Sequence, residues 1–407
     1  MLTSRGSGLV GGAIALWVAS QTFGAAELQI AAVAALVLVG LALAWVWLTS
    51  THLEVDRLVQ PTKLPFGGTG EARLAVTNRG PRRTALLRLR ERAPSSLASP
   101  PDRTVAPLAA GERIELHYTL RARQRGVAEL GPLSAEFSDP FSLISRTREL
   151  PGSVTVTVRP NVVALARGLP LGGMSGGSGE GRPRPRPGGQ DLADVREYVS
   201  GDPLRSVHWP STAHRGKLMV RREEGPQDPR ATVLLDLRAH HHRGNGPGAS
   251  LETAVTAAAS VIVHLSQRRQ AVALLDRGVT GSPPVRTAES WLDHLAEVEA
   301  TSSSLRGILA PLAAGGSVGS TFVAIVAAPT GGDLTTLVRV GRSASTRVAL
   351  LVDPAQHVDP TATDERTAAA ALRLKAAGWR VTILGSGDEL AQRWQDIVHV
   401  RRTGVGA

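Results

Sequence analysis

The sequence predicts a multi-domain protein with three parts: an N-terminal transmembrane α-hairpin, an antiparallel β-sandwich and a C-terminal doubly wound α/β domain. Three observations predict these parts. A charge-free apolar run lies near the N-terminus, residues 53–160 alternate between apolar and polar side chains, and from residue 231 onward short apolar runs alternate with helical periodicity. The chain has 407 residues, which is enough for several domains with cores of their own.

Two apolar runs predict membrane-spanning helices over residues 9–26 and 28–48, after a short N-terminal segment at 1–8. No charge occurs between Ile30 and Leu48, and the second run is long enough to cross about 30 Å of hydrocarbon. The first run is weaker because serine, glutamine and threonine interrupt it. It also fits a cleaved signal peptide, in which case the second run would act as the stop-transfer segment.

Basic residues next to the apolar runs predict the orientation in the membrane. Arg5 precedes the first run, and Arg57 and Lys63 follow the second, whereas the connection between the runs carries no lysine or arginine. Positive residues favour the cytoplasmic side, so both ends of the pair are expected there. We therefore expect a cell-membrane protein with two spans, the lipid bilayer as one partner, and the bulk of the chain in the cytoplasm.

The next part, residues 53–160, is predicted to fold as an antiparallel β-sandwich resembling immunoglobulin-like domains. The clearest alternation runs from Ile114 to Leu120, and shorter examples lie at 72–76, 85–89 and 154–158. Glycine-, proline- and asparagine-rich turn signals separate these runs. Several half-buried strands at such spacing are typical of a sandwich.

A linker is predicted at 168–189, where glycine, proline and arginine dominate and favour an extended chain. It contains the string Gly173–Gly177, which matches the G-x-S-x-G nucleophile elbow, and a second match lies at 315–319. The elbow requires a strand before the serine and a helix after it. Neither match has that context, so we interpret both as chance.

Residues 231–400 are predicted to form the doubly wound domain, because near-continuous apolar runs of strand length alternate with helical segments. An apolar stripe at helical spacing predicts a helix over 251–269 with Ser250 as its N-cap. Further helices are expected at 333–340 and 364–377. The predicted parallel strands are Thr232–Asp236, Ala271–Leu275, Phe322–Ala327, Val348–Val352 and Val381–Leu384.

Three aspartates, Asp236, Asp276 and Asp353, follow predicted strands. Ligand sites in such sheets lie beyond the carboxyl ends of the strands. The three carboxylates could therefore hold a hard cation such as Mg²⁺, or they could cap neighbouring turns and helices. We favour capping, because the three strands need not be neighbours.

The composition excludes several classes of protein. Because the chain has no cysteine, a disulfide scaffold, a thiolate zinc site, an iron–sulfur cluster and a cysteine nucleophile are ruled out. The net charge is +11, and 43 of the 46 basic residues are arginines. Such a skew can arise from coding bias, so we expect no nucleic-acid partner. A G-x-x-x-x-G-K-[ST] phosphate loop is also absent from the sequence.

The most distinctive stretch of the sequence is 190–230. An apolar stripe at Leu192, Val195 and Val199 predicts two helical turns, and Gly201-Asp202-Pro203 ends them. The arginine and histidine side chains that follow could bind an anion or a carboxylate beside a tryptophan. Alternatively, the tryptophan is a buried anchor and the charges tie the segment to the sheet. The residues concerned are Arg205, His208, Trp209, His214 and Arg215.

This stretch, with Gly126–Phe141 and the two-span N-terminus, resembles the bacterial family known as domain of unknown function fifty-eight. The residues that carry the resemblance are Arg196-Glu197-Tyr198, Gly201-Asp202-Pro203, Arg205 to Trp209, and Ala213. The resemblance extends over nearly the whole chain. It implies a C-terminal domain similar to von Willebrand factor type A folds, association with MoxR-type AAA+ ATPases, and often association with transglutaminase-like membrane proteins.

The resemblance also bears on metal binding. Type A domains with a metal-ion-dependent adhesion site carry Asp-x-Ser-x-Ser after the first strand, and the corresponding residues here are Asp236, Arg238 and His240. Both hydroxyl ligands are absent and a guanidinium stands where the cation would lie, so the resemblance implies no metal and no cofactor. Three consecutive histidines, 240–242, rarely converge on one tetrahedral ion, and we expect them to be solvated in a loop.

We therefore predict a non-enzymatic, membrane-anchored adaptor or scaffold that presents the type A-like domain to a cytosolic MoxR-type ATPase in envelope or complex-assembly processes. Two alternatives stay open: a metal-dependent ligand-binding or adhesion protein using Asp236, and a hydrolase using a pair such as His208 and Ser211. The predicted partner-binding residues are Arg196, Tyr198, Asp202, Arg205, His208, Trp209, Arg215 and Asp236.

Overall fold

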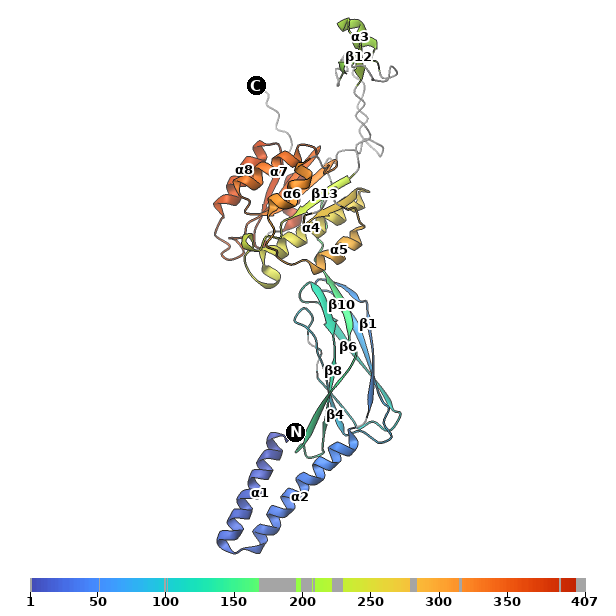
Figure 1. Cartoon of the computed structure of the whole chain (residues 1–407), viewed down its shortest axis with the longest axis vertical. Helices are drawn as coiled ribbons and strands as arrows, with labels where there is room; N and C mark the ends of the chain where they lie inside the picture. The colour runs from blue at the N-terminus through green and yellow to red at the C-terminus, as the bar shows by residue number, and fades with distance from the viewer. Residues whose placement is uncertain are drawn as a thin grey trace. The chain divides into compact units, whose positions relative to one another are not determined.

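The computed structural model describes residues 2–50, 52–98, 100, 102–167, 195–198, 207, 209–221, 230–278, 284–314, 317–387 and 389–399. The predicted linker at 168–189 lies outside them. The chain divides into two compact units, whose elements are labelled in Figure 1. Unit 1 comprises Met1–Val163, Gly244–Ser260 and Ala288–Ala300, and unit 2 comprises Ala164–Arg243, Val261–Thr287 and Thr301–Ala407.

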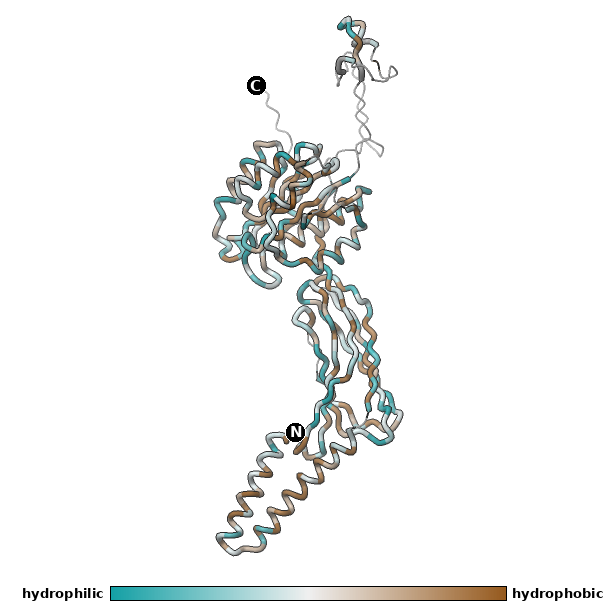
Figure 2. The backbone as a smooth tube through the Cα atoms, viewed as in Figure 1, coloured by the Kyte–Doolittle hydropathy of each residue, from teal (hydrophilic) through white to brown (hydrophobic). Residues whose placement is uncertain are grey.

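Unit 1 begins with two helices, α1 (Ser4–Phe23) and α2 (Ala26–Thr49). They are joined at Gly24, which has a φ of 63° and ends α1 in the left-handed conformation that glycine tolerates best. The two helices lie side by side, and both are rich in apolar residues (Figures 1 and 2). Of the described helices, α2 is the one whose length and composition would let it cross a membrane. It is therefore a candidate membrane anchor.

Strands β1 to β10 of unit 1 form three sheets with the strand orders β1-β3-β6, β2-β10-β7 and β5-β4-β8-β9. Neighbouring strands are antiparallel except for β2 and β10, which are parallel. The alternating run at 114–120 lies on β6, where exposure also alternates along the strand. The strands are β1 (Leu53–Gln60), β2 (Lys63–Pro65), β3 (Thr69–Asn78), β4 (Leu86–Glu91), β5 (Arg103–Val105), β6 (Arg113–Arg121), β7 (Gly126–Leu130), β8 (Leu133–Ser138), β9 (Ser145–Leu150) and β10 (Val154–Arg159).

Both helices meet the same hydrophobic cluster of the β module. Ala42 and Val46, in the last two turns of α2, are buried in this cluster together with Phe137 and Leu143. The start of α1 is tied to the same loop, because the Thr3 amide donates a 3.0 Å hydrogen bond to the Leu143 carbonyl. The end of α2 and the start of α1 therefore lie at one end of the β module.

A buried ion pair in the interior of the β module shares its carboxylate with a tyrosine. The Arg57 Nε donates a 2.5 Å hydrogen bond to one carboxylate oxygen of Glu91, and the Tyr118 hydroxyl donates to the other. The side chains of Arg57 and Glu91 are each 3% exposed. Burial, together with the hydrogen bond to Glu91, raises the pKa of Tyr118, so the phenol stays neutral and keeps donating. Arg57, predicted as an orienting charge near the membrane, is thus a structural residue of the interior.

Unit 1 also contains η3 (Gly246–Gly248), the start of α4 (Ser250–Gln267) and α5 (Ala288–Glu297). Arg125, whose side chain is 7% exposed, pairs with Glu252 at 2.8 Å. Arg159 pairs with Asp293 at 2.7 Å, and the hydrogen bond from this guanidinium is the main reason that the pKa of Asp293 is lowered. The first ion pair joins the residue before β7 to the start of α4, and the second joins the end of β10 to α5.

Unit 2 contains a five-stranded parallel sheet in the order β14-β13-β15-β16-β17. Each strand begins within two residues of the first residue of the corresponding strand that the sequence predicted. All seven residues of β15 are buried, as a central strand covered on both faces requires. The strands are β13 (Arg230–Leu235), β14 (Ala271–Leu275), β15 (Thr321–Ala327), β16 (Thr346–Val352) and β17 (Arg380–Leu384).

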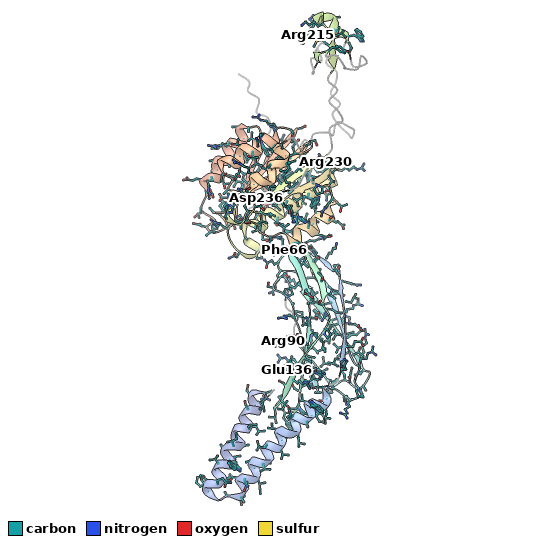
Figure 3. All side chains as sticks on the ribbon, viewed as in Figure 1. Phe66, Arg90, Glu136, Arg215, Arg230 and Asp236 are labelled. Carbon is teal, nitrogen blue, oxygen red and sulfur yellow. The ribbon has the colours of Figure 1, made fainter. Side chains whose placement is uncertain are left out.

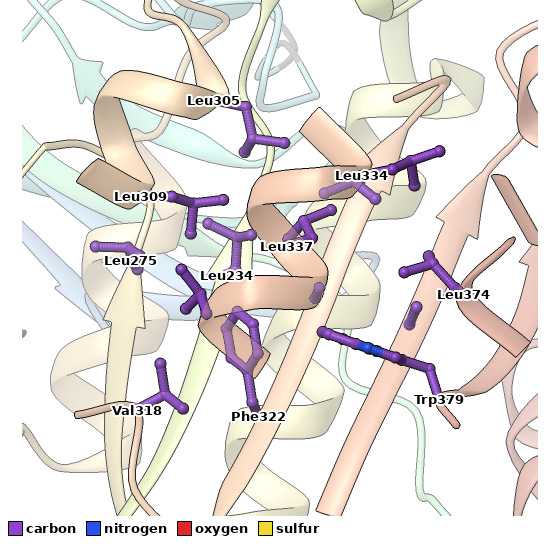
Figure 4. Packing of buried hydrophobic residues seen from close by; sticks show 14 of the residues in the cluster. Leu234, Leu275, Leu305, Leu309, Val318, Phe322, Leu334, Leu337, Leu374 and Trp379 are labelled. Carbon is purple, nitrogen blue, oxygen red and sulfur yellow. The ribbon is translucent and has the colours of Figure 1, made fainter. Parts of the chain in front are cut away.

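Helices α6 (Leu305–Ala313), α7 (Gly331–Gly341) and α8 (Glu365–Ala376) pack on this sheet. Figure 4 shows their leucines meeting Phe322 and Trp379 in one cluster. Gly341 lets the indole ring of Trp379 approach α7, since a Cβ at residue 341 would lie 2.3 Å from its Cζ2 atom. Unit 2 also contains η2 (Ala239–His241) and α9 (Leu390–His399).

The described part of the 190–230 stretch forms β11 (Val195–Glu197), α3 (Trp209–Arg215) and β12 (Met219–Arg221). The predicted helix is wrong at its centre, because Val195–Glu197 is a strand that pairs antiparallel with β12. The physical reason is local: β-branched and aromatic residues such as Val195 and Tyr198 favour extended backbone, and a neighbouring strand offers them a partner.

Candidate functional site

The sheet of unit 2 has one point where ligands are expected to bind. From β13 the chain continues to β14 on one side, and later to β15 on the other side of β13. Open α/β sheets hold their ligands at such a reversal of strand order, in a crevice at the carboxyl ends of the strands, which here are β13 and β15. Asp236 directly follows β13, and Ala328 directly follows β15. The crevice between them is therefore the candidate site.

A single guanidinium occupies this crevice. The Arg238 Nε and Nη2 atoms donate to the two carboxylate oxygens of Asp236 at 2.8 and 2.7 Å, which is a bidentate ion pair. The Nη1 atom donates to Asp333 at 2.9 Å. Arg238 is 4% exposed and Asp236 is 1% exposed, so the ion pair is closed to solvent. One internal cation thus connects the end of β13 to the start of α7.

Asp333 is held in position by the first turn of α7. Thr330 and Asp333 form a capping box, in which each side chain accepts a hydrogen bond from the other residue's backbone N–H. Burial alone would raise the pKa of Asp333, but hydrogen bonds from Thr330 and from the Arg238 guanidinium outweigh it and lower the pKa. Likewise, burial opposes the charge of Arg238, but the hydrogen bonds that it donates to the Asp236 and Asp333 carboxylates prevail and raise its pKa. Asp333 and Arg238 are therefore both charged at neutral pH.

Two of the three consecutive histidines bond to backbone carbonyls at the ends of β13 and β15. The Nδ1 atom of His241 lies 3.0 Å from the carbonyl oxygens of Ala327 and Ala328, and the Nε2 atom of His242 lies 2.9 Å from the carbonyl oxygen of Asp236. Carbonyls only accept, so each of these nitrogens carries the proton. Burial is the main cause that lowers the pKa of both imidazoles. Our expectation of three solvated histidines is therefore wrong for His241 and His242, each 8% exposed, while His240 is exposed.

The three predicted carboxylates do not converge on one point. Asp276 follows β14, next to β13, but Asp353 follows β16, which β15 separates from β13. The Asp353 carboxylate accepts hydrogen bonds from the amides of Ala355 and Asp364, at 3.0 and 3.2 Å, and so holds the turn that leads into α8. Within the described residues, no group of three or more histidine, aspartate or glutamate side chains is placed to hold a metal ion. For Asp353, capping is the observed role.

The predicted partner-binding residues fall into four groups. Asp236 lies in the crevice, whereas Trp209 and Arg215 are the first and last residues of α3 (Figure 3 labels Asp236 and Arg215). Trp209 is 69% exposed, so its interpretation as a buried anchor is wrong. Tyr198 is half-buried beside β12, and Arg196 lies on β11. Asp202, Arg205 and His208 lie outside the described residues.

Sequence reasoning missed Asp333 as a partner of Arg238, although it placed a helix there. The signal was present as Thr330 followed three residues later by Asp333, which is the pattern of a capping box. Nothing in that pattern indicates a bond to Arg238, 95 residues away in the chain. Only the position of β15 beside β13 brings the two residues together.

Comparisons with known proteins add one family match. The family described as "Protein of unknown function DUF58" matches residues 194–317, which include the crevice residues Asp236 and Arg238. No curated protein matches the chain.

Among solved structures, the CARDB domain of a Pyrococcus furiosus protein in complex with di-metal ions is 18% identical, with a TM-score of 0.20, and the match covers 26% of this chain and 92% of that one. The C-terminal domain of wzt is 10% identical, with a TM-score of 0.22 and coverage of 28% and 76%. A FixG-related protein from Vibrio parahaemolyticus is 13% identical, with a TM-score of 0.19 and coverage of 26% and 95%. At such TM-scores we assign neither fold nor function from these structures.

Proposed function

We propose that this chain, which matches the DUF58 family over residues 194–317, is a non-enzymatic, membrane-anchored adaptor or scaffold. In this proposal its α/β domain is similar to von Willebrand factor type A domains and is presented to a cytosolic MoxR-type AAA+ ATPase. A transglutaminase-like membrane protein is a further candidate partner, and the setting is envelope or complex assembly.

The observation that carries the proposal is the occupied crevice. In a sheet of this kind, the switch point is where a cofactor, nucleotide or metal would bind. Here Arg238 pairs with both Asp236 and Asp333 within the protein itself, and each carboxylate also accepts a hydrogen bond from a backbone amide. A site of this kind stabilises the domain and offers no open position to a substrate. The remaining role for the domain is recognition through its surface.

The arrangement of the two N-terminal helices supports the two-span anchor. If α2 crosses the bilayer from the β module, its far end at Ala26 lies on the opposite side. The start of α1 is hydrogen-bonded to the same end of the β module through Thr3. The helix α1 must then return across the same thickness, although it is less apolar than α2. In this proposal the connection at Gly24 lies on the far side of the membrane.

Recovery of the partner tests the adaptor proposal. The full chain, solubilised in mild detergent from cells that carry their own MoxR-type ATPase, should retain that ATPase on an affinity resin. A Trp209→Ala variant should retain clearly less, because an exposed indole is a strong candidate for an interface anchor. Phe141→Ala is the matched control, since Phe141 is also a largely exposed aromatic residue but lies in the β module. Failure of the full chain to retain any such ATPase would overturn the partner assignment.

Labelling of single cysteines tests the orientation. The chain has no cysteine of its own, so each introduced thiol is the only reactive one. A membrane-impermeant maleimide should label Ala25→Cys, at the connection between α1 and α2, in intact cells. It should label Gln392→Cys, on the exposed side of α9, only after lysis. Labelling of Gln392→Cys in intact cells would place the α/β domain outside and contradict a cytosolic partner.

A further inference from the structure

The two edges of the parallel sheet in unit 2 differ. At one edge, β14 is partly covered, because Ala273 forms an antiparallel bridge with Val285 and the Arg286 amide donates to the Val272 carbonyl at 3.3 Å. At the other edge, β17 pairs with β16 on one side, and none of the described strands pairs with its other side. Exposed strand edges present backbone donors and acceptors that another chain can use.

A groove runs along this free edge. Its volume is about 850 Å³, and its lining includes four consecutive residues of β17, from Arg380 to Ile383. Successive side chains of a strand point to opposite faces of the sheet. Four consecutive residues can therefore line one groove only if the groove follows the edge of the strand. The four residues are all partly exposed, whereas β15 is buried throughout.

Two helices form the walls of the groove. Ala371 and Lys375 come from α8, and Arg393, Asp396 and Ile397 come from α9. The groove is thus lined by both helices that contact β17, α8 and α9. Four of the five residues of β17 line it, so an extended segment of about five residues, at roughly 3.3 Å per residue, could run along the strand.

The charges of the groove indicate which kind of segment it suits. Three cationic side chains line it, on Lys375, Arg380 and Arg393, against one anionic side chain on Asp396. Lys375 and Arg393 are exposed on opposite walls, where they could pair with carboxylates of a bound strand. Val381 and Ile383 supply apolar contacts between them.

We propose that the edge of β17 is a peptide-binding site, which takes an extended acidic segment of a partner protein as an additional strand of the sheet. Backbone hydrogen bonds to β17 provide the affinity, and the cations on α8 and α9 select acidic side chains. The proposal goes beyond the adaptor function and does not depend on the partner being an ATPase. Failure to recover an ATPase would leave it intact, and its own test uses a synthetic probe.

The test measures binding of a fluorescein-labelled peptide, in which glutamate and aspartate alternate with valine, to the full chain in detergent micelles. Fluorescence anisotropy at low ionic strength should show saturable binding. The double variant Lys375→Glu with Arg393→Glu should bind the probe about tenfold more weakly or worse, because two favourable surface charge pairs become repulsive. The matched control is Arg342→Glu with Arg366→Glu, which changes the same charge at two exposed residues outside the groove and should bind normally.

Two further measurements separate strand addition from simple charge attraction, and they use the unaltered protein. A probe with N-methylated backbone amides carries the same charges but cannot pair with a strand, so it should lose binding. The unmodified probe should slow hydrogen exchange at the amides of β17 and leave those of β14 unchanged.

Several outcomes would overturn the proposal. Equal binding of the N-methylated probe, or of a probe with lysine in place of the acidic residues, would show that no strand is added. Equal binding to the groove variant and to its control would place the probe elsewhere. Binding that appears only after residues 400–407 are removed would assign the groove to the protein's own C-terminal segment.

Discussion

Replacing Arg238 with alanine should destabilise unit 2 by about 3–5 kcal/mol, the usual cost of removing one partner from a buried ion pair. The side chain of Arg238 is 5% exposed, and its carboxylate partners on Asp236 and Asp333 are 1% and 10% exposed. Three charge-assisted hydrogen bonds of 2.7 to 2.9 Å would be lost, leaving two buried carboxylates without their cation. Protonation of a carboxylate would relieve part of this cost, so the deficit should be smaller at about pH 5 than at neutral pH.

Hydrogen exchange of the full chain in detergent measures this loss locally, through the opening free energies of the amides in β13 and β15. Arg277→Ala is the control, because Arg277 also pairs with an aspartate at a strand end, but at 3.4 Å and with a side chain 66% exposed. A surface pair of this kind contributes about 0–1 kcal/mol. If Arg238→Ala costs no more than this control, the crevice is not closed by its internal ion pair and the reasoning is wrong.

Three further predictions follow from the same structure. Mg²⁺ should leave the midpoint temperature of thermal unfolding of the unaltered protein unchanged. It should raise that temperature in the Arg238→Ala variant, because the two carboxylates released from Arg238 can share a cation. Calorimetry with and without Mg²⁺ measures both midpoints. The pKa of Tyr118 is raised in the folded protein. The free energy of unfolding should therefore stay constant up to about pH 10, where tyrosine of the unfolded chain ionises, and fall above that pH. In a Tyr198→Phe variant, in which Tyr118 is the remaining tyrosine, tyrosinate absorbance should appear together with unfolding. Because the pKa of His242 is lowered, its contribution to the free energy of unfolding should be complete above about pH 6.5 and decrease as the pH falls below it. The His242→Gln variant should flatten this decrease.

Each of these predictions has an outcome that contradicts it. A magnesium-dependent shift in the unaltered protein would mean that the cation reaches the crevice despite Arg238. Ionisation of Tyr118 without unfolding would mean that its hydrogen bond to Glu91 is open to solvent. An unchanged acid profile in His242→Gln would assign the loss of stability at low pH to other groups.

The elements of the parallel sheet were predictable because burial on both faces leaves a clear signal in the sequence. Strands such as β15 consist almost entirely of apolar residues, and the α4 helix carries its apolar stripe at helical spacing behind a serine. The prediction of a helix around Val195 was wrong, because a stripe of three apolar residues fits a short strand as well as two helical turns. Three residues are too few to distinguish the two periods.

The candidate site was only half predictable. The sequence showed Arg238 two residues from Asp236 at the end of a predicted strand. It could not show Asp333 or the carbonyls of Ala327 and Ala328 as partners, because these come from distant segments that the strand order brings together. For the same reason, the burial of His241 could not be inferred from its glycine-rich surroundings.

The packing of α2 against the β module has a practical consequence for anyone who wishes to purify this protein without detergent. Cutting the chain after residue 50 would remove Ala42 and Val46 from the hydrophobic cluster and expose neighbours such as Phe137 and Leu143 to water. The shortened protein would then expose a hydrophobic patch where α2 had packed, and it would tend to aggregate through this patch. Such aggregation would not report the stability of the intact protein. Charged substitutions on that patch should accompany any such truncation.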